Sequence, residues 1–544
     1  MGPYFSASID PPKALASGRF LSFRVHAMAS PGSLEADGQS RLVLVILLTL
    51  SVSLNAIFLT SWMWAGFSRS GAVLIQSGTV TTDDLVSSRK EIEVFPGAGW
   101  SRKASEAAEA TSLVNCSGNG EMYTDTLPVT AEVAEGLCEC YECFTGPHCS
   151  EHVENCSADV NSGTPLLFAP FWKQNAEESA VLIPGWYRIG YAFMEDSSVS
   201  ISPALEREIR ILHNLVGNAV VDNKYIVLGV GSMQLLKAAV ASLACDRRTA
   251  DVVAAVPYFP AYREQSLLFE TAHFTWAGDA NVYAQEHLGM NSSTIEFVNS
   301  PNNPDGMVRH AVLNGCDAFT IYDYAYYWPH FTAITEAADQ DVMLFTLSKL
   351  TGHAGSRLGW AIVKNYTLYE RLLTYLQLSI ITVSHETQLR ATQLLRVING
   401  AYSGQLHAEQ MIPLGLPPAY YASKGLSFHY GYVVLRDRWM KLNQILNQSK
   451  RFGVQHLEPA YCKFFKEVTG PSPAYAWVYC KQENDEDCQA VLQQAGIISR
   501  GGKKFDSSTR FTRLSLLKRV STFENLINHL SFLVSEEINF ILLK

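Results

Sequence analysis

The stretch YIVLGVGSMQLLKAAVASL, residues 225–243, decides the fold class of this chain. An apolar run of strand length, YIVLGV, leads into a tight turn with Gly229 and Gly231, and a helix-like segment begins near Ser232. The free backbone N–H groups and the dipole at such a helix start favour a phosphate group. The stretch therefore predicts a strand, a turn and a helix, with an anion site at the turn.

The same alternation of helices and apolar strands continues on both sides of this stretch. LEREIRILHNLVGNAV has apolar residues at helical spacing, and DVVAAV, TIEFVN, AFTIY and DVMLFTL are apolar runs of strand length. This pattern predicts an α/β fold with a mainly parallel, doubly wound sheet, which binds ligands at the carboxyl ends of its strands. Beyond Lys364, the helical stretches YERLLTYLQL, ETQLRATQLLRVI and FHYGYVVLRDRWMKLNQILNQ and the apolar runs AYAWVYC and FTRLSLL predict a smaller α/β domain that closes over the site.

Polar side chains stand at the ends of the predicted strands, in the order Asn303, Asp323, Tyr326, Thr346, Lys349 and Arg357. Each of them alone has an ordinary explanation, as a turn residue, a cap or a solvated lysine in a loop. Together they fit the needs of pyridoxal 5′-phosphate (PLP). That cofactor requires a lysine amine for covalent attachment, a carboxylate at the pyridine nitrogen, donors to the ring oxygen and a cationic phosphate site.

The strings SPNNPDG, YDYAYYWPHFT and LFTLSKLTGHAGSRLGWA resemble the plant alliinases and tryptophan aminotransferase-related proteins, which are fold-type I PLP-dependent enzymes. The similarity extends from about Cys116 to Leu543. The resemblance implies that Lys349 carries the cofactor, that Asp323 pairs with its pyridinium nitrogen, and that Asn303 and Tyr326 bond its ring oxygen.

The resemblance also implies roles for residues outside these strings. Tyr258 would stack on the cofactor ring, Arg513 would bind the α-carboxylate of the substrate, and Tyr191 would reach the phosphate of a neighbouring subunit in a homodimer. The phosphate would be surrounded by Ser232, Met233, Gln234, Thr346 and Arg357. The family usually has a threonine where this chain has Met233, so one hydroxyl contact is missing while the backbone N–H remains.

An uncharged apolar segment, LVLVILLTLSVSLNAIFLTSWMWAGF, occupies residues 42–67. At about 1.5 Å per residue it can cross a hydrocarbon core of about 30 Å. It predicts a transmembrane signal anchor, preceded by a cytosolic tail at 1–41 and followed by a flexible stalk at 68–112. The alternative is a cleaved signal peptide and a secreted or vacuolar protein, although signal peptides usually have shorter apolar cores nearer the terminus.

Six of the eleven cysteines crowd into the 41 residues from Cys116 to Cys156. Asn-x-Ser/Thr sequons follow the apolar segment and, with the cysteines, favour a catalytic part in the lumen of the endoplasmic reticulum or beyond. In that compartment the cysteines indicate three disulfides rather than a zinc site, and we expect no metal. Their spacing alone leaves the pairing open. The sequons lie at Asn115, Asn155, Asn291, Asn365 and Asn447.

The run CECYECFTGPHCSEHVENCSADV resembles the EGF-like module of alliinases. That resemblance implies the pairs Cys116–Cys138, Cys140–Cys149 and Cys143–Cys156, and the pair Cys480–Cys488 coincides with a further alliinase disulfide. We therefore expect the module at 113–157, a PLP-binding large domain with an N-terminal arm at 158–365, and a small domain at 366–544. A structural role and a partner-binding role for the module both remain open.

The balance of charged residues limits the kinds of binding partner that we expect. Lys and Arg number 42 against 52 Asp and Glu, and the net charge of −10 argues against nucleic acid. Small amino acids and 2-oxo acids are the expected substrates. Our first hypothesis is an aminotransferase that converts tryptophan to indole-3-pyruvate for auxin biosynthesis. The alternatives are an alliinase-type carbon-sulfur lyase that cleaves S-alkyl-L-cysteine sulfoxides by β-elimination, and an inactive anchored binding protein.

Overall fold

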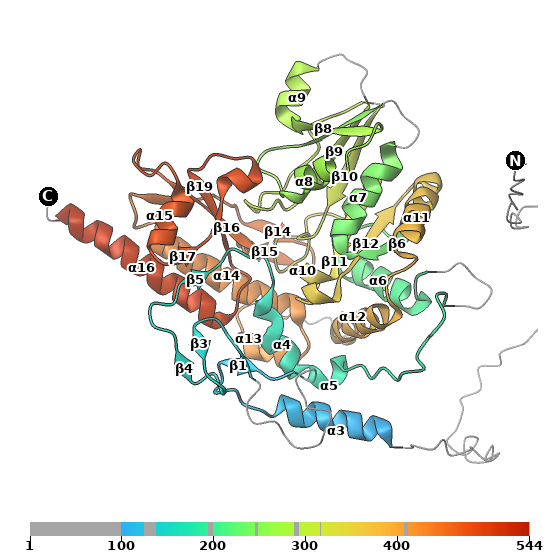
Figure 1. Cartoon of the computed structure of the whole chain (residues 1–544), viewed down its shortest axis with the longest axis horizontal. Helices are drawn as coiled ribbons and strands as arrows, with labels where there is room; N and C mark the ends of the chain where they lie inside the picture. The colour runs from blue at the N-terminus through green and yellow to red at the C-terminus, as the bar shows by residue number, and fades with distance from the viewer. Residues whose placement is uncertain are drawn as a thin grey trace, which may run out of the picture. The chain divides into compact units, whose positions relative to one another are not determined.

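A computed structural model describes residues 99–123, 138–193, 200–244, 249–287, 293–315, 317–406 and 412–542 (Figure 1). The predicted tail and the apolar segment 42–67 lie outside these ranges. In the part of the chain that is described, no helix has the length and apolar character needed to span a membrane. Residues 100–112, which we predicted to belong to a flexible stalk, form helix α3 (Trp100–Ser112). Its alanine- and glutamate-rich sequence explains the difference, because these residues favour helices.

The central layer is a seven-stranded sheet with the order β6-β12-β11-β10-β9-β7-β8. Strand β12 runs antiparallel to both neighbours, and the other pairings are parallel. The sheet is therefore mixed but mainly parallel, as predicted. Its strands are β6 (Tyr225–Val230), β7 (Ala250–Ala254), β8 (Phe274–Asp279), β9 (Thr294–Asn299), β10 (Ala318–Asp323), β11 (Val342–Thr346) and β12 (Leu358–Val363). The sequence analysis missed β8, an edge strand whose side chains are mostly only half-buried.

Helices cover both faces of this sheet (Figure 1). Alternate residues of β11 point to opposite sides, so that Leu344 joins the core under α7 (Gly231–Ala244) and α11 (Tyr366–Ile380), while Phe345 joins the core on the other face. Burial on both faces explains why the strands are continuous apolar runs. The remaining helices of this layer are α6 (Pro203–Val216), α8 (Ala261–Leu268), α9 (Ala280–Glu286), α10 (Leu347–Leu350) and α12 (His385–Leu406).

The C-terminal part contains an antiparallel sheet with the order β13-β16-β19-β18. The predicted helix in FHYGYVVLRDRWMKLNQILNQ and the predicted strands in AYAWVYC and FTRLSLL are present as α14, β16 and β19. The elements are α13 (Pro418–Ser423), α14 (Ser427–Leu446), β13 (Phe452–Val454), β14 (Ala460–Cys462), β15 (Glu467–Thr469), β16 (Tyr475–Cys480), α15 (Cys488–Gln494), β17 (Ile497–Ile498), β18 (Arg500–Gly501), β19 (Phe511–Ser515) and α16 (Val520–Leu542).

Four disulfides join the cysteine pairs that the resemblance implied, Cys116–Cys138, Cys140–Cys149, Cys143–Cys156 and Cys480–Cys488. The first three close the module around two small hairpins, in which β1 pairs with β2 and β3 with β4. Cross-links replace an apolar core, which a segment of this size cannot build. The strands are β1 (Gly120–Glu121), β2 (Glu139–Cys140), β3 (Phe144–Thr145) and β4 (Glu151–His152).

The chain passes from the module directly into the C-terminal part. Strand β5 (Ala158–Asp159) pairs in parallel with β17, and the carbonyl oxygen of Val160 accepts a hydrogen bond of 2.9 Å from the backbone of Ser515. Two short helices, α4 (Ala169–Gln174) and α5 (Ala176–Ser179), follow before the chain reaches α6. Residues 158–160, which we expected to belong to the N-terminal arm of the large domain, thus form hydrogen bonds with the C-terminal part.

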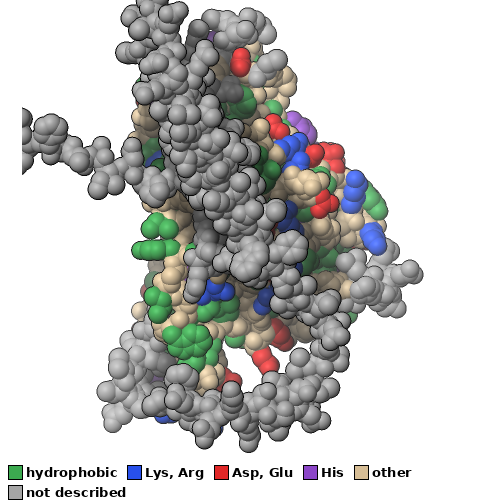
Figure 2. Space-filling view, turned by 90° about the vertical axis from the view of Figure 1, so that its right-hand side faces the viewer, with side chains coloured by type: hydrophobic (Ala, Val, Ile, Leu, Met, Phe, Trp, Pro, Cys, Tyr) green, Lys and Arg blue, Asp and Glu red, His purple; other side chains and the backbone are tan. Residues whose placement is uncertain are grey.

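The exposed charges are mixed in sign. On the part of the surface visible in Figure 2, basic and acidic side chains lie interspersed, with hydrophobic side chains between them.

Candidate functional site

The predicted site residues meet in a cavity of about 220 Å³ at the carboxyl ends of β9, β10 and β11. The start of α7 and residues of the C-terminal part complete its walls. Of the residues that the sequence singled out, those that line the cavity are Ser232, Met233, Asn303, Asp323, Tyr326, Thr346, Lys349, Arg357 and Arg513. Gly163, Phe259, Tyr475 and Arg500 also line it and were not predicted.

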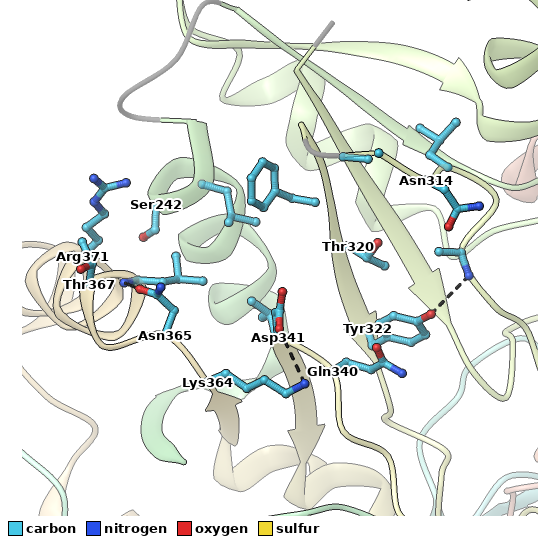
Figure 3. Close-up of a pocket in the computed structure, with 18 residues that line it drawn as sticks. Ser242, Asn314, Thr320, Tyr322, Gln340, Asp341, Lys364, Asn365, Thr367 and Arg371 are labelled. Carbon is cyan, nitrogen blue, oxygen red and sulfur yellow. Dashed lines mark hydrogen bonds and ion pairs between the residues drawn. The ribbon is translucent and has the colours of Figure 1, made fainter. Parts of the chain in front are cut away.

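A larger cavity of about 920 Å³ lies at the other edge of the sheet, where β10 and β11 begin (Figure 3). Lys364 reaches toward Asp341 across its wall, with 3.7 Å between Nζ and Oδ1. None of the predicted site residues lines it. Ligands of doubly wound sheets bind at the carboxyl ends of the strands, so the smaller cavity is the candidate active site.

Lys349 lies in the one-turn helix α10, where we had predicted a loop. Thr346 caps that helix, since its Oγ1 accepts a hydrogen bond of 3.3 Å from the backbone of Ser348. Lys349 Nζ donates to the carbonyl oxygen of Gly163. Burial lowers the pKa of Lys349, and the charges of Arg513 and Arg357 lower it further. The lysine therefore gives up its proton more readily than a solvated one, as nucleophilic and general-base lysines must.

Asp323 is the last residue of β10, and it is 4% exposed. Its Oδ2 accepts a hydrogen bond of 2.8 Å from the hydroxyl of Tyr262, and its Oδ1 accepts one of 3.1 Å from the backbone of Ala325. Burial raises the pKa of Asp323, although both hydrogen bonds and the charge of Lys349 oppose that shift. Tyr262, on α8, stacks on Phe297 and was not found by sequence, because a tyrosine in a helix carries no signal of a distant carboxylate.

At the predicted phosphate site, the backbone at the start of α7 lies close to the side chain of Arg357. Gly231 has φ +70° at the start of α7, and a Cβ atom added there would lie 2.5 Å from Arg357 Nη2. A Cβ on Gly359 of β12 would lie 2.7 Å from the backbone nitrogen of Ser232. Met233 lines the cavity, whereas Gln234 does not and instead accepts a hydrogen bond of 2.8 Å from the backbone of Val230.

Arg513, in β19, lies at the opposite end of the cavity and is 1% exposed. Its Nη1 donates to Asn303 Oδ1 and its Nη2 to the carbonyl oxygen of Asn161, both at 2.7 Å. Among the described residues its buried Nε has no hydrogen-bond partner. A buried donor without a partner is costly, so this arginine is suited to an anionic ligand such as a carboxylate. Arg500 is also held by Asn161, whose Oδ1 accepts from its Nε at 2.7 Å.

Two tyrosines connect the ends of the cavity. The hydroxyl oxygens of Tyr326 and Tyr475 are 2.6 Å apart, and Arg513 Cζ lies 4.0 Å from the centre of the Tyr475 ring. Burial favours a higher pKa for Tyr475, but the charges of Lys349 and Arg513 outweigh it and lower the pKa. Tyr475 therefore gives up its hydroxyl proton more readily than an ordinary tyrosine. The sequence analysis did not predict this residue.

Besides Gln234, two predicted residues, Tyr258 and Tyr191, do not line the cavity. Tyr258 is buried with its ring 5.3 Å from that of Trp276, its hydroxyl donates to Asp506, and its neighbour Phe259 lines the cavity instead. Tyr191 is 73% exposed, and its carbonyl oxygen lies 3.2 Å from His385 Nε2. The stacking role of Tyr258 and the intersubunit role of Tyr191 stay predictions.

The geometry fits PLP. The cavity offers a lysine amine, a buried carboxylate with its own donors, and a helix start beside an arginine. Arg513 adds a buried donor for the acid group of an amino acid. When bound, PLP supplies an electron sink for charge that develops at the α-carbon of an amino acid. The fold and the site thus define a PLP-dependent enzyme.

The comparisons with known proteins identify the family. The family model described as Allinase matches residues 158–534, and the model described as Alliinase EGF-like domain matches residues 99–156. The chain belongs to the alliinase family of PLP-dependent enzymes, whose members include transaminases and carbon-sulfur lyases.

Relatives of both kinds are similar to this chain. Tryptophan aminotransferase-related protein 3 of Arabidopsis thaliana is 42% identical, over 80% of this chain and 91% of that protein. Alliin lyase 1 of Allium sativum is 40% identical, over 80% of this chain and 86% of that protein. Among solved structures, the kynurenine aminotransferase of Pyrococcus horikoshii is 14% identical with a TM-score of 0.49, covering 70% of this chain and 91% of that one.

Proposed function

We propose that the protein is an aminotransferase for an L-amino acid, with tryptophan as donor and indole-3-pyruvate, an auxin precursor, as product. The observation that carries the proposal is that Lys349, Asp323 and Arg513 line one cavity. The choice of tryptophan rests on relatives named tryptophan aminotransferase-related, two of which are at least 40% identical.

Each residue contributes a separate step. Arg513, which lines the cavity, binds the α-carboxylate and so orients the amino acid. The amine of Lys349, with its lowered pKa, removes the proton from the α-carbon of the amino acid. In transamination the same amine would deliver that proton to the cofactor carbon that bears the amino group. Asp323, which accepts a hydrogen bond from the hydroxyl of Tyr262, would keep the pyridine nitrogen of bound PLP protonated.

Carbon-sulfur lyase activity is the second candidate. Relatives named alliin lyase are 40% identical to this chain, and the chain carries the disulfide module and the Cys480–Cys488 pair that we associated with alliinases. The residues described above serve this reaction equally, since proton removal by Lys349 can be followed by loss of a sulfenate from the β-carbon of a cysteine sulfoxide.

Product analysis separates the two reactions. Purified protein loaded with PLP is incubated with tryptophan and a 2-oxo acid, or with an S-alkyl-L-cysteine sulfoxide alone. We expect indole-3-pyruvate that depends on the 2-oxo acid, and no product from the variant Lys349→Ala. Release of ammonia and pyruvate from the sulfoxide, without turnover of tryptophan, would replace the aminotransferase proposal with the lyase.

We also propose that residues 42–67 anchor the protein in a membrane of the secretory pathway, with the catalytic part in the lumen. The disulfides support this location, because cytosolic thiols stay reduced. Protease treatment of sealed microsomes should leave the catalytic part intact, and degradation without detergent would contradict the proposal.

The exposed side chain of Tyr191 supports the proposal of a homodimer, in which it reaches the partner's site. Mixing and refolding Tyr191→Ala with Lys349→Ala should then restore activity in mixed dimers. No recovery, although light scattering shows dimers, would refute the shared site.

A further inference from the structure

The disulfide module lies beside the start of α16 (Figure 1), and side chains of the two segments contact each other. Glu142 forms an ion pair of 3.0 Å with Lys518 and accepts a hydrogen bond from Thr522. Asn525 Nδ2 donates to the carbonyl oxygen of Cys156 at 3.1 Å. Arg519 Cζ lies 4.0 Å from the centre of the Tyr141 ring. These contacts use charged and polar side chains, so they fix one orientation of the module more narrowly than apolar contact would.

Lys518 connects the module with Ser162. It is 4% exposed, and its Nζ lies 3.0 Å from Glu142 Oε1 and 3.4 Å from Ser162 Oγ. A buried ammonium group requires a counter-ion, and here the module supplies it. Glu142 therefore determines where the amine of Lys518 lies, and that amine in turn contacts Ser162.

Ser162 lies in the segment that forms one wall of the active site. The residue before it, Asn161, accepts hydrogen bonds from Arg513 through its backbone and from Arg500 through its side chain, both at 2.7 Å. The residue after it, Gly163, accepts a hydrogen bond from Lys349 Nζ. Three consecutive residues thus connect the module with the active site. Asn161 contacts Arg513, Ser162 contacts Lys518, and Gly163 contacts Lys349.

The other end of this segment begins at Cys156, which is bonded to Cys143 in the module. Between the two ends, the backbone of Val160 donates to Ile498 and accepts from Ser515, each at 2.9 Å. The segment is held by the module at one end and by the C-terminal sheet along its length. Displacement of the module would therefore move Asn161, one of the two acceptors of Arg513.

We propose that the disulfide module is a positioning element of the active site, which fixes segment 157–163 through the Cys143–Cys156 disulfide and the Glu142–Lys518–Ser162 contacts. Asn161 is the positioning residue that aims Arg513 and Arg500 into the cavity. This inference rests on the proposed role of Arg513 in binding the substrate carboxylate, and it assigns the module a function within the enzyme rather than toward a partner.

The test compares Glu142→Gln with the control Glu154→Gln. Glu154 lies in the same module, is exposed, and forms no polar contact with any residue that the structure describes. We expect Glu142→Gln to raise KM for the amino acid about threefold to tenfold, the worth of one hydrogen bond, with a smaller change in kcat. Hydrogen exchange of the Val160 amide should accelerate, and the PLP absorption should be unchanged. Glu154→Gln should match the wild type.

Ser162→Ala provides a milder second variant, because it removes one hydroxyl and leaves the ion pair intact. It should shift KM and the exchange of Val160 in the same direction by a smaller factor. A lowered Tm in either variant, with KM and exchange unchanged, would show that the module only stabilises the fold and would overturn the inference. If neither reaction is detected, the proposed function fails, and the exchange measurement still decides whether the module positions the segment.

Discussion

Replacement of Tyr262 by phenylalanine should weaken PLP binding and slow turnover through Asp323. The Tyr262 hydroxyl donates to Asp323 Oδ2 at 2.8 Å, and the tyrosine is 1% exposed. Phenylalanine keeps the ring that stacks on Phe297 but cannot donate this hydrogen bond. The substitution therefore removes one contact to a buried carboxylate and leaves the packing in place.

The size of the effect follows from the energy of a hydrogen bond to a charged group, which is about 1.5–3 kcal/mol. Without this hydrogen bond the pKa of Asp323 should rise further. The direction is upward because the Tyr262 hydroxyl stabilises the charged carboxylate and opposes the effect of burial. A protonated carboxyl group cannot form an ion pair with the pyridinium nitrogen, so the loss of about 1.5–3 kcal/mol should reduce PLP affinity by about 10-fold to 100-fold.

Equilibrium dialysis of the apoenzyme against PLP measures this affinity, and steady-state kinetics with saturating PLP measures kcat. Tyr283→Phe is the matched control, since Tyr283 also donates to a carboxylate, Asp251 Oδ2 at 2.7 Å, and neither residue lines the cavity. PLP affinity and kcat of Tyr262→Phe within about twofold of the wild type, a change of about 0.4 kcal/mol, would refute the role of this hydrogen bond.

Three further predictions concern the phosphate turn, a buried histidine and the fourth disulfide. Gly359→Ala should lower stability by about 1–3 kcal/mol and weaken PLP binding, because the added Cβ would lie 2.7 Å from the backbone nitrogen of Ser232, which cannot move alone. Burial lowers the pKa of His213 from 6.5 to about 4. The unfolded chain therefore binds more protons between these values, and His213 alone should contribute about 3 kcal/mol to the fall in the free energy of unfolding as the pH decreases through that window. Replacing Cys480 and Cys488 by serine, which opens a loop with a sequence separation of 8, should cost about 2.5 kcal/mol.

Urea unfolding measures all three, with PLP titration added for the glycine variant. Normal PLP affinity in Gly359→Ala would mean that β12 does not support the turn. A free energy of unfolding that is equal at pH 7 and pH 4.5, about half a unit above the folded pKa, would contradict the assignment of His213. Unchanged stability of the serine variant would show that the surrounding contacts hold α15 without the bond.

Much of the large sheet could be predicted because its strands are local features. Each is a short apolar run bounded by turn residues, and Asn303, Asp323 and Lys349 stand next to such runs in the chain. Parallel strands bring their carboxyl ends to one edge of the sheet. Residues that directly follow these strands in the sequence therefore lie close together in the fold. The edge strand β8 was not predicted, because its partly exposed position leaves it too few apolar residues to form a recognisable run.

The sequence by itself determined the strand ends, the crowded cysteines and the family resemblance, since all three are patterns within contiguous segments. The tertiary structure alone decided the partners of those residues. Arg513 meets Asn303 across 210 residues and Asn161 across 352, and Lys349 meets Gly163 across 186. Contacts at such separations leave no periodic or local signal. Burial, and with it the lowered pKa of Lys349 and the raised pKa of Asp323, exists only once these distant segments have packed together.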